Sequence, residues 1–100
     1  MKPPELVWTT RALTEFDEII AYIRSQDPAT ADQVVARIDE RVGSLLSHPR
    51  LGRPGRIRGT RELVVAPFIV AYEITDDLIV VLAVLRESRR WPRTFRAQRR

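Results

Sequence analysis

The stretch VLAVLRESRRWP, residues 81–92, places the side chains best suited to binding chemistry directly after an apolar run. Val81–Leu85 is entirely apolar, the next six residues are Arg86, Glu87, Ser88, Arg89, Arg90 and Trp91, and Pro92 then interrupts regular structure. Guanidinium groups are permanently charged and form bidentate hydrogen bonds with phosphates and carboxylates. Arginine and tryptophan are also the residues enriched at interface hot spots. The cluster therefore predicts a surface that holds an anionic or protein partner.

A second group of arginines lies upstream, in HPRLGRPGRIRG (residues 48–59), where no acidic residue separates them. Its prolines and glycines predict a basic loop without regular structure. Arginines from this loop, from the strand expected after it and from the cluster at 86–90 could face one groove. The predicted target-binding set is Arg56, Arg58, Arg61, Arg86, Arg89, Arg90 and Trp91.

Two kinds of activity fit such a groove. RNA cleavage needs a base for the 2′-hydroxyl, an acid for the leaving oxygen and cations for the developing charge. The nuclease candidates are Arg61, Arg86, Glu87 and Arg89, but arginine is a poor proton shuttle. Glutamates such as Glu62 and Glu87 should have a lowered pKa beside arginines. A protein that only binds its target needs no proton transfer, and this alternative is favoured.

The composition and the distribution of charge further limit the kinds of partner and the classes of protein that are possible. Residues 1–49 carry five basic and eight acidic side chains, a balance of −3, whereas residues 50–100 carry twelve and five, a balance of +7. The basic half predicts an anionic partner. With no cysteine and a single histidine, we expect no disulfide, no metal site and no cofactor. We see no signal peptide and no apolar stretch of membrane-spanning length, so we expect a soluble cytoplasmic protein.

Hydrophobic periodicity positions these side chains on an α+β fold. We expect a short strand at residues 5–8, then a helix capped by Thr9 or Thr10 whose apolar stripe includes Phe16, Ile20 and Ile23. Asp27 and Pro28 should start a second helix that runs to about residue 47 and folds back on the first. Strands are expected at 61–66, 68–75 and 78–85, with a tight turn at Asp76-Asp77. The non-alternating pattern of 78–85 predicts an interior strand covered on both faces.

The order is β-α-α-β-β-β, a helical hairpin packed on a small, largely antiparallel twisted sheet. We expect one domain over residues 1–92 and a basic C-terminal tail over 93–100.

This order, with the residues that fill it, resembles the RelE/ParE superfamily of bacterial toxins from type II toxin–antitoxin systems. The resemblance is carried by VWTTRALTEFDEIIAYI, DPATADQVVARI, SHPRLGRPGRIRGTRELVV, IVAYEI and VLAVLRESRRWP, in this order and spacing. It covers the chain from about Val7 to Pro92. The RelE/ParE-like fold that it implies agrees with the element order predicted from periodicity.

The resemblance implies a growth-inhibiting toxin that is neutralised by a cognate, ParD-like antitoxin with an acidic toxin-binding segment. RelE-like members are ribosome-dependent mRNA endoribonucleases, whereas ParE-like members poison DNA gyrase without cutting anything themselves. RelE-like nucleases usually carry Tyr, His or Lys near the end of the last strand, and this chain has Arg86 there. The ParE-like reading is favoured, with the ribosome and mRNA as the alternative target. The antitoxin is expected to contact Phe16, Ile20, Ile23, Arg93, Phe95 and Arg96.

Overall fold

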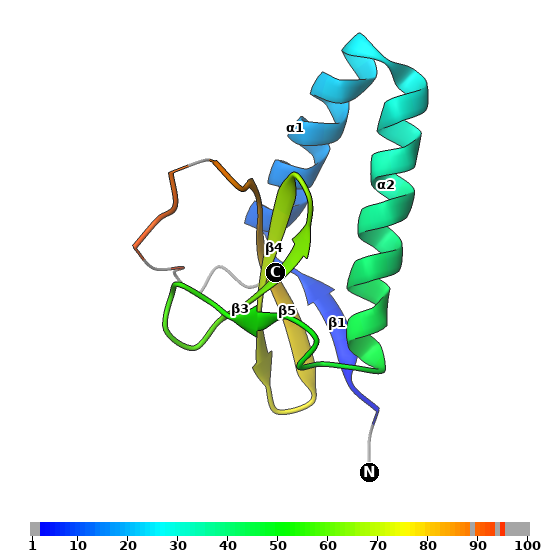
Figure 1. The fold of residues 1–100 in the computed structure, drawn as a ribbon. Helices are drawn as coiled ribbons and strands as arrows, with labels where there is room; N and C mark the ends of the chain where they lie inside the picture. The colour runs from blue at the N-terminus through cyan, green and yellow to red at the C-terminus, as the bar shows by residue number, and fades with distance from the viewer. Residues whose placement is uncertain (1–2, 89, 94, 96–100) are drawn as a thin grey trace.

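The computed structural model describes residues 3–88, 90–93 and 95. Its elements follow the chain as β1 (Glu5–Trp8), α1 (Thr10–Gln26), α2 (Pro28–Gly43), a 3-10 turn (Ser44–Leu46), β2 (Arg53–Pro54), β3 (Arg61–Val65), β4 (Phe68–Thr75) and β5 (Leu78–Arg86). Figure 1 shows the two helices as an antiparallel hairpin beside a twisted sheet. The predicted α+β class and the order of the elements are confirmed.

The helical hairpin is defined by side-chain caps at the predicted residues. The Thr9 hydroxyl accepts from the amide of Ala12 at 3.0 Å and begins α1. Asp27 ends α1 and also begins α2, where its carboxylate accepts from the amides of Ala29 and Thr30 and Pro28 occupies the first turn. These hydrogen bonds lower the pKa of Asp27, the side-chain bond from Thr30 contributing most. One residue thus serves two helix ends, which makes the hairpin tight.

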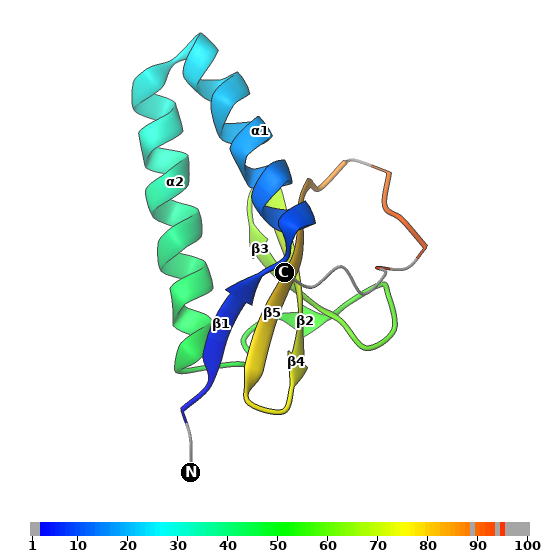
Figure 2. The same ribbon diagram turned by 180° about the vertical axis from the view of Figure 1, so that it is seen from behind.

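The sheet has the strand order β1-β5-β4-β3-β2. β1 pairs with β5 in parallel, and every other neighbouring pair is antiparallel. Figure 2 shows β1 beside β5 at one edge and the short β2 at the other. β5 is therefore interior over Leu78–Val81, as its sequence predicts, and all its residues from Ile79 to Leu85 are buried.

A β-bulge interrupts the pairing of β4 with β5. Ala71 pairs with Ala83, but the next residue of β4, Tyr72, pairs with Val81, so Leu82 is left without a partner. The bulge reverses which side chains face the helices: Val81 faces them before it and Val84 faces them after it. At the same place the hydroxyl of Thr9 donates to the carbonyl of Leu82 at 3.2 Å.

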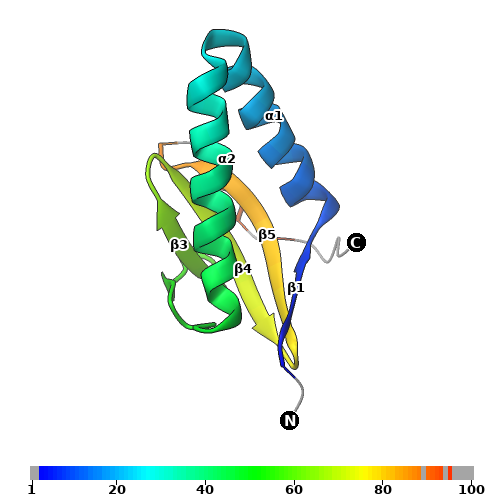
Figure 3. The same ribbon diagram turned by 90° about the vertical axis from the view of Figure 1, so that its right-hand side faces the viewer.

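The main core lies between the sheet and the helical hairpin, which covers one face of the sheet and extends past its end (Figure 3). Trp8 packs against this core, with its ring centroid 5.5 Å from that of Phe16. The opposite face carries a smaller cluster, in which Trp91 and Phe95 cover Ala71, Ala83 and Leu85. Both faces of β5 are thus covered, and the C-terminal segment provides part of the cover.

One expectation for the loop is wrong. We expected no regular structure over residues 48–59, but Arg53–Pro54 forms the short strand β2 against Arg61 and Glu62 of β3. Pro54 is tolerated because β2 is an edge strand, where a missing N–H need not break the ladder.

Candidate functional site

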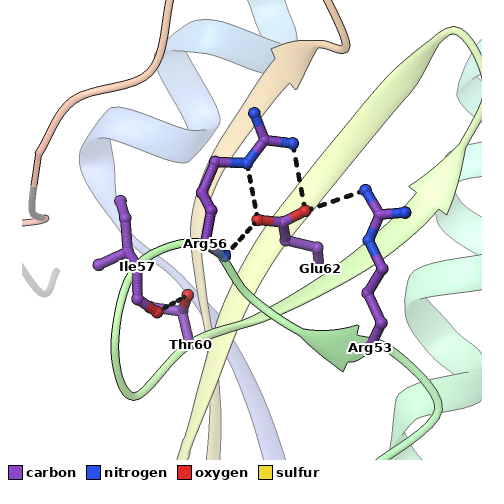
Figure 4. A network of polar contacts seen from close by, with 5 residues as sticks. All are labelled: Arg53, Arg56, Ile57, Thr60 and Glu62. Atoms are coloured by element: carbon purple, nitrogen blue, oxygen red, sulfur yellow. Dashed lines mark hydrogen bonds and ion pairs between the residues drawn. The ribbon is translucent and has the colours of Figure 1, made fainter.

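The carboxylate of Glu62 organises the basic loop. Its side chain is buried, and it accepts hydrogen bonds from Arg56 Nε at 2.9 Å, from the backbone amide of Arg56 at 2.8 Å and from Arg53 Nη2 at 3.1 Å. Figure 4 shows the carboxylate between the two guanidinium groups. Two of the loop arginines, Arg53 and Arg56, thus share one acid from the neighbouring strand.

This arrangement sets the ionisation of Glu62. Burial alone would raise the pKa of the carboxyl, but the hydrogen bonds from Arg56 and Arg53 and the charge of Arg56 outweigh it, so the pKa of Glu62 lies below its ordinary value. The lowered pKa expected from the sequence is confirmed. A carboxylate held in the ionised form is a weak proton acceptor, and the contacts of Glu62 anchor the loop to β3.

The guanidinium of Arg56 also contacts Trp91. Its central carbon lies 3.8 Å from the centroid of the indole ring, and Arg11 on α1 lies 5.1 Å from the ring centroid of Phe95. These cation–π contacts bring the loop, the C-terminal segment and the start of α1 together. In Figures 1 and 2 the loop and the C-terminal segment lie on the same side of the sheet. Two of the predicted target-binding residues, Arg56 and Trp91, are thereby in direct contact.

Arg86 lies on the other face of the sheet. Its guanidinium is 5.2 Å from the ring centroid of its cross-strand neighbour Phe68, which belongs to the main core. The side chain lines a hollow of about 210 Å³ beside α1, together with Glu15, Glu18, Ile19, Tyr22 and Val84. Arg86 and Arg56 are therefore separated by the sheet and do not share one groove.

Arg61 is engaged within the chain. Its Nη1 donates to the carbonyl of Gly52 at 2.5 Å and lies 3.4 Å from that of Arg50. The hydroxyl of its cross-strand neighbour Tyr72 donates to the carbonyl of Pro49 at 2.7 Å and accepts from the amide of Gly52 at 2.9 Å. Arg61 and the fully buried Tyr72 thus fix the start of the loop, and the Tyr72 hydroxyl makes both of its hydrogen bonds within the chain.

The remaining predicted residues are exposed or lie outside the described part of the chain. Arg58, Glu87, Arg90 and Arg93 are exposed at the surface of the loop and the C-terminal segment. Arg89 and Arg96 lie outside the described residues. Phe95 packs on its own sheet, against the smaller cluster.

The predicted antitoxin-binding residues of α1, namely Phe16, Ile20 and Ile23, are partly buried and pack against the main core. They belong to α1, and the hairpin that α1 forms with α2 extends past the end of the sheet (Figure 3). Tyr22, which precedes Ile23 on α1, is 64% exposed.

Sequence reasoning did not predict the roles of several other side chains at the edges of the sheet. Glu15 Oε1 accepts from the backbone amide of Val84 at 3.0 Å, and Glu15 also pairs with Arg11. Arg37 and Arg41 of α2 donate to the carbonyls of Ala66 and Val64. The spacing of Arg37 and Arg41, four residues apart beside the buried Ile38 and Val42, was the available signal.

Over the described residues, none of the helices is both long and apolar enough to cross a membrane. The same part of the chain contains no group of three or more His, Cys, Asp or Glu side chains arranged to hold a metal ion.

A helical hairpin on one face of a five-stranded mixed sheet, with a basic loop and an arginine-rich end to the last strand, defines a RelE/ParE-like toxin. The family model described as "ParE toxin of type II toxin-antitoxin system, parDE" matches residues 6–91. The chain belongs to this family.

Individual proteins that are similar to this chain support the same family. "Putative toxin Y4kP" of Sinorhizobium fredii is 46% identical over 97 residues, covering 95% of this chain and all of that protein. "Toxin RelE2" of Caulobacter vibrioides is 28% identical over 85 residues, covering 85% of this chain and 97% of that one. A chain of the solved structure "Chromosomal ParDE TA system from P. aeruginosa" superposes with a TM-score of 0.77 at 27% identity, covering 84% of this chain and 96% of that one.

Proposed function

We propose that this ParE-family toxin inhibits growth by binding and poisoning DNA gyrase in the cytoplasm, and that a ParD-like antitoxin neutralises it. The single observation that carries the proposal is the state of Glu62. It is the one carboxylate that the described structure places among the loop arginines, and both its oxygens already accept from guanidiniums. A basic surface whose acid is held in the ionised form at neutral pH can bind an anionic or protein target but is ill suited to proton transfer.

The proposed target surface is the exposed part of the loop and of the C-terminal segment. Arg58 and Arg90 are exposed and form no ion pair with any described residue, so both charges are available to a partner. The contact between Arg56 and Trp91 holds the two segments together. Arg89 completes the proposed set. Arg61 is engaged by the carbonyl of Gly52 and Arg86 lies on the opposite face of the sheet, so neither belongs to this surface.

The proposed antitoxin surface is the inner side of the projecting hairpin. Phe16, Ile20 and Ile23 keep part of their apolar area exposed there, which an amphipathic antitoxin segment could cover. Arg93 and Phe95, with Arg96, form the second proposed contact for an acidic segment.

The test is a supercoiling assay with purified gyrase and relaxed plasmid. The proposal expects the wild-type chain to suppress supercoiling and to trap cleaved DNA, and expects Arg58→Ala with Arg90→Ala to weaken both effects by at least about tenfold. The double variant should still bind antitoxin, which separates loss of the surface from loss of the fold. Supercoiling that is untouched at toxin levels that arrest growth would contradict the proposal.

The alternative is ribosome-dependent mRNA cleavage, and one observation favours it. Tyr22, Glu18 and Arg86 all line the hollow beside α1. A carboxylate, a phenol and a guanidinium are an acid–base pair with a charge stabiliser in principle. Programmed ribosomes followed by primer extension test it: codon-phased cuts that disappear with Tyr22→Phe would establish the nuclease, and no cuts would exclude it.

A further inference from the structure

The face of the sheet that the helices leave open carries an excess of positive charge. Arg53 and Arg56 share the single carboxylate of Glu62, so one positive charge remains over at this cluster. Arg58 and Arg90 are exposed and form no ion pair with any described residue. We call these four arginines, Arg53, Arg56, Arg58 and Arg90, the basic face. They come from the segments 48–61 and 86–93, whose sequence contains a single acid, at position 87.

The two arginines at Glu62 are held in place and still have N–H groups to offer. Arg56 bonds to the carboxylate through Nε and Nη2, and Arg53 through Nη2, so no hydrogen bond found in the described structure uses the Nη1 of either guanidinium. Figure 4 shows one terminal nitrogen of each guanidinium directed away from the carboxylate. A guanidinium has more donors than one carboxylate occupies, and its fork geometry matches phosphate oxygens. Glu62 therefore orients both side chains without using up their capacity to bind an anion.

Over the residues that the structure describes, the basic face offers charge but no exposed aromatic ring. Trp91 and Phe95 pack inward against the smaller cluster on the sheet, and the guanidinium of Arg56 covers the Trp91 ring at 3.8 Å. Proteins that bind single strands stack unpaired bases on free aromatic rings. A duplex instead presents its phosphate backbones, which arginines bind without any stacking. The basic face therefore suits a duplex better than a single strand.

We propose that the basic face binds the phosphate backbone of duplex DNA, so that this toxin contacts the DNA held by gyrase as well as the enzyme. Binding of the duplex stands on the charge and the geometry of the face, whereas gyrase as the holder of that duplex rests on the proposed function. Contacts to phosphates carry no sequence information, so the binding should not depend on DNA sequence. A chain bound to both DNA and enzyme would stabilise the cleaved complex, which is what poisoning requires.

Fluorescence anisotropy of a labelled DNA duplex, titrated with the full-length chain at several salt concentrations, tests the proposal. Each phosphate that a protein neutralises contributes about −0.9 to the slope of the logarithm of the association constant against the logarithm of the salt concentration. The four arginines predict a slope at least as steep as about −3. A slope near zero would overturn the proposal. Tighter binding to a single-stranded RNA of the same length would overturn it too, because that would assign the face to RNA.

Charge variants locate the binding on the molecule. Arg58→Gln with Arg90→Gln should make the slope shallower by about two and raise the Kd for the duplex by at least about tenfold at physiological salt. Arg37→Gln with Arg41→Gln is the matched control, since both arginines are exposed on α2, which packs on the opposite face of the sheet. It removes the same charge and should change Kd by less than about threefold, because salt screens charges over about 8 Å. Equal effects of the two double variants would show that net charge alone governs binding and would overturn the proposal.

A crosslink identifies what the basic face touches in the complex with gyrase. The chain has no cysteine, so Arg58→Cys places a photoreactive label at a single position and leaves the other three arginines in place. With gyrase and plasmid present, this label should crosslink to DNA, whereas the same label on Arg41→Cys should not. Crosslinks from Arg58→Cys to gyrase subunits alone would overturn the proposal in favour of a protein contact.

The inference and the proposed function fail separately. A chain that binds the duplex with the predicted slope but leaves supercoiling untouched would contradict the proposed function, while the DNA-binding face would stand. A chain that poisons gyrase but shows neither affinity for the duplex nor a crosslink to DNA would overturn the inference, while the proposed function would stand.

Discussion

The guanidinium carbon of Arg56 lies 3.8 Å from the centroid of the Trp91 ring, while its Nε donates to Glu62 at 2.9 Å. One arginine thus ties an acid of β3, the basic loop and the C-terminal segment into a single unit. The unit covers the face of the sheet that the helices leave open, so stability and the proposed target surface depend on the same side chain.

The cover by Trp91 should contribute measurably to stability. Trp91→Ala removes the ring from Arg56 and uncovers Ala71 and Ala83, and we expect the free energy of unfolding to fall by about 2 kcal/mol, less than for a fully buried tryptophan. Trp91→Phe is the matched control. The indole N–H is buried without a hydrogen-bond partner in the described structure, so its loss should cost under about 1 kcal/mol. Urea unfolding compares the three proteins, and an unchanged midpoint for Trp91→Ala would show that the segment does not hold the sheet.

Glu62 should make stability depend on acid pH. Its folded-state pKa lies below the ordinary value of 4.5, so the unfolded chain binds more protons in that range and the stabilisation is complete above about pH 4.5. It is lost as the pH falls through the folded-state pKa. Unfolding measured from pH 7 to pH 3 should show wild type well above Glu62→Gln at neutral pH, by about 1–3 kcal/mol, with the two curves converging in acid. Asp27, whose pKa is also lowered, is present in both proteins, so its contribution cancels. Parallel curves would contradict the role given to the Glu62 charge.

The hydroxyl of Tyr72 should hold the start of the loop. Tyr72→Phe leaves the carbonyl of Pro49 and the amide of Gly52 without this partner, and we expect a loss of about 1–3 kcal/mol. Tyr22→Phe is the matched control, because Tyr22 is 64% exposed and its hydroxyl is free to hydrate. Thermal unfolding provides the comparison. Equal melting temperatures for the two variants would mean that water replaces the buried hydroxyl without cost.

The side chain of Thr9 should contribute more to stability than that of Thr10. Thr9→Val keeps the shape but removes the cap on Ala12 and the bond to the carbonyl of Leu82 at the bulge, which should cost about 1–3 kcal/mol. Thr10→Ala, at the exposed first residue of α1, is the control and should cost under about 0.5 kcal/mol. Chemical unfolding of the two variants compares their free energies of unfolding. A larger loss for Thr10→Ala than for Thr9→Val would mean that Thr10, and not Thr9, caps α1.

Local signals predicted most of the fold. Three features depend only on residues that are neighbours in sequence, so residue order was enough to predict them. They are the start of α2 at Asp27-Pro28, the turn at Asp76-Asp77 and the buried strand β5. The bulge at Leu82 could not be predicted from residue order, because it depends on where β1 ends beside β5 and where α1 begins. β2 is held by cross-strand contacts rather than by propensity, and it was missed for the same reason.

The candidate site was predictable in composition but not in arrangement. The sequence identified the arginines and Trp91, yet alternation along β3 places Glu62 on one face of the sheet and Arg61 on the other. Arg56 therefore meets Trp91, while Arg86 lies across the sheet beside α1. Arg37 and Arg41 act on carbonyls of a strand far along the chain, and a helical pattern does not reveal such partners.

The central claim is that this toxin acts by binding and not by turnover, and stoichiometry tests it most directly. A fixed amount of gyrase with plasmid is titrated with the chain, and trapped linear DNA is measured alongside mRNA integrity on programmed ribosomes. The account predicts that trapped DNA saturates near one toxin per gyrase binding site while the mRNA remains intact. Trace amounts of toxin that leave gyrase working and degrade an excess of mRNA would contradict it.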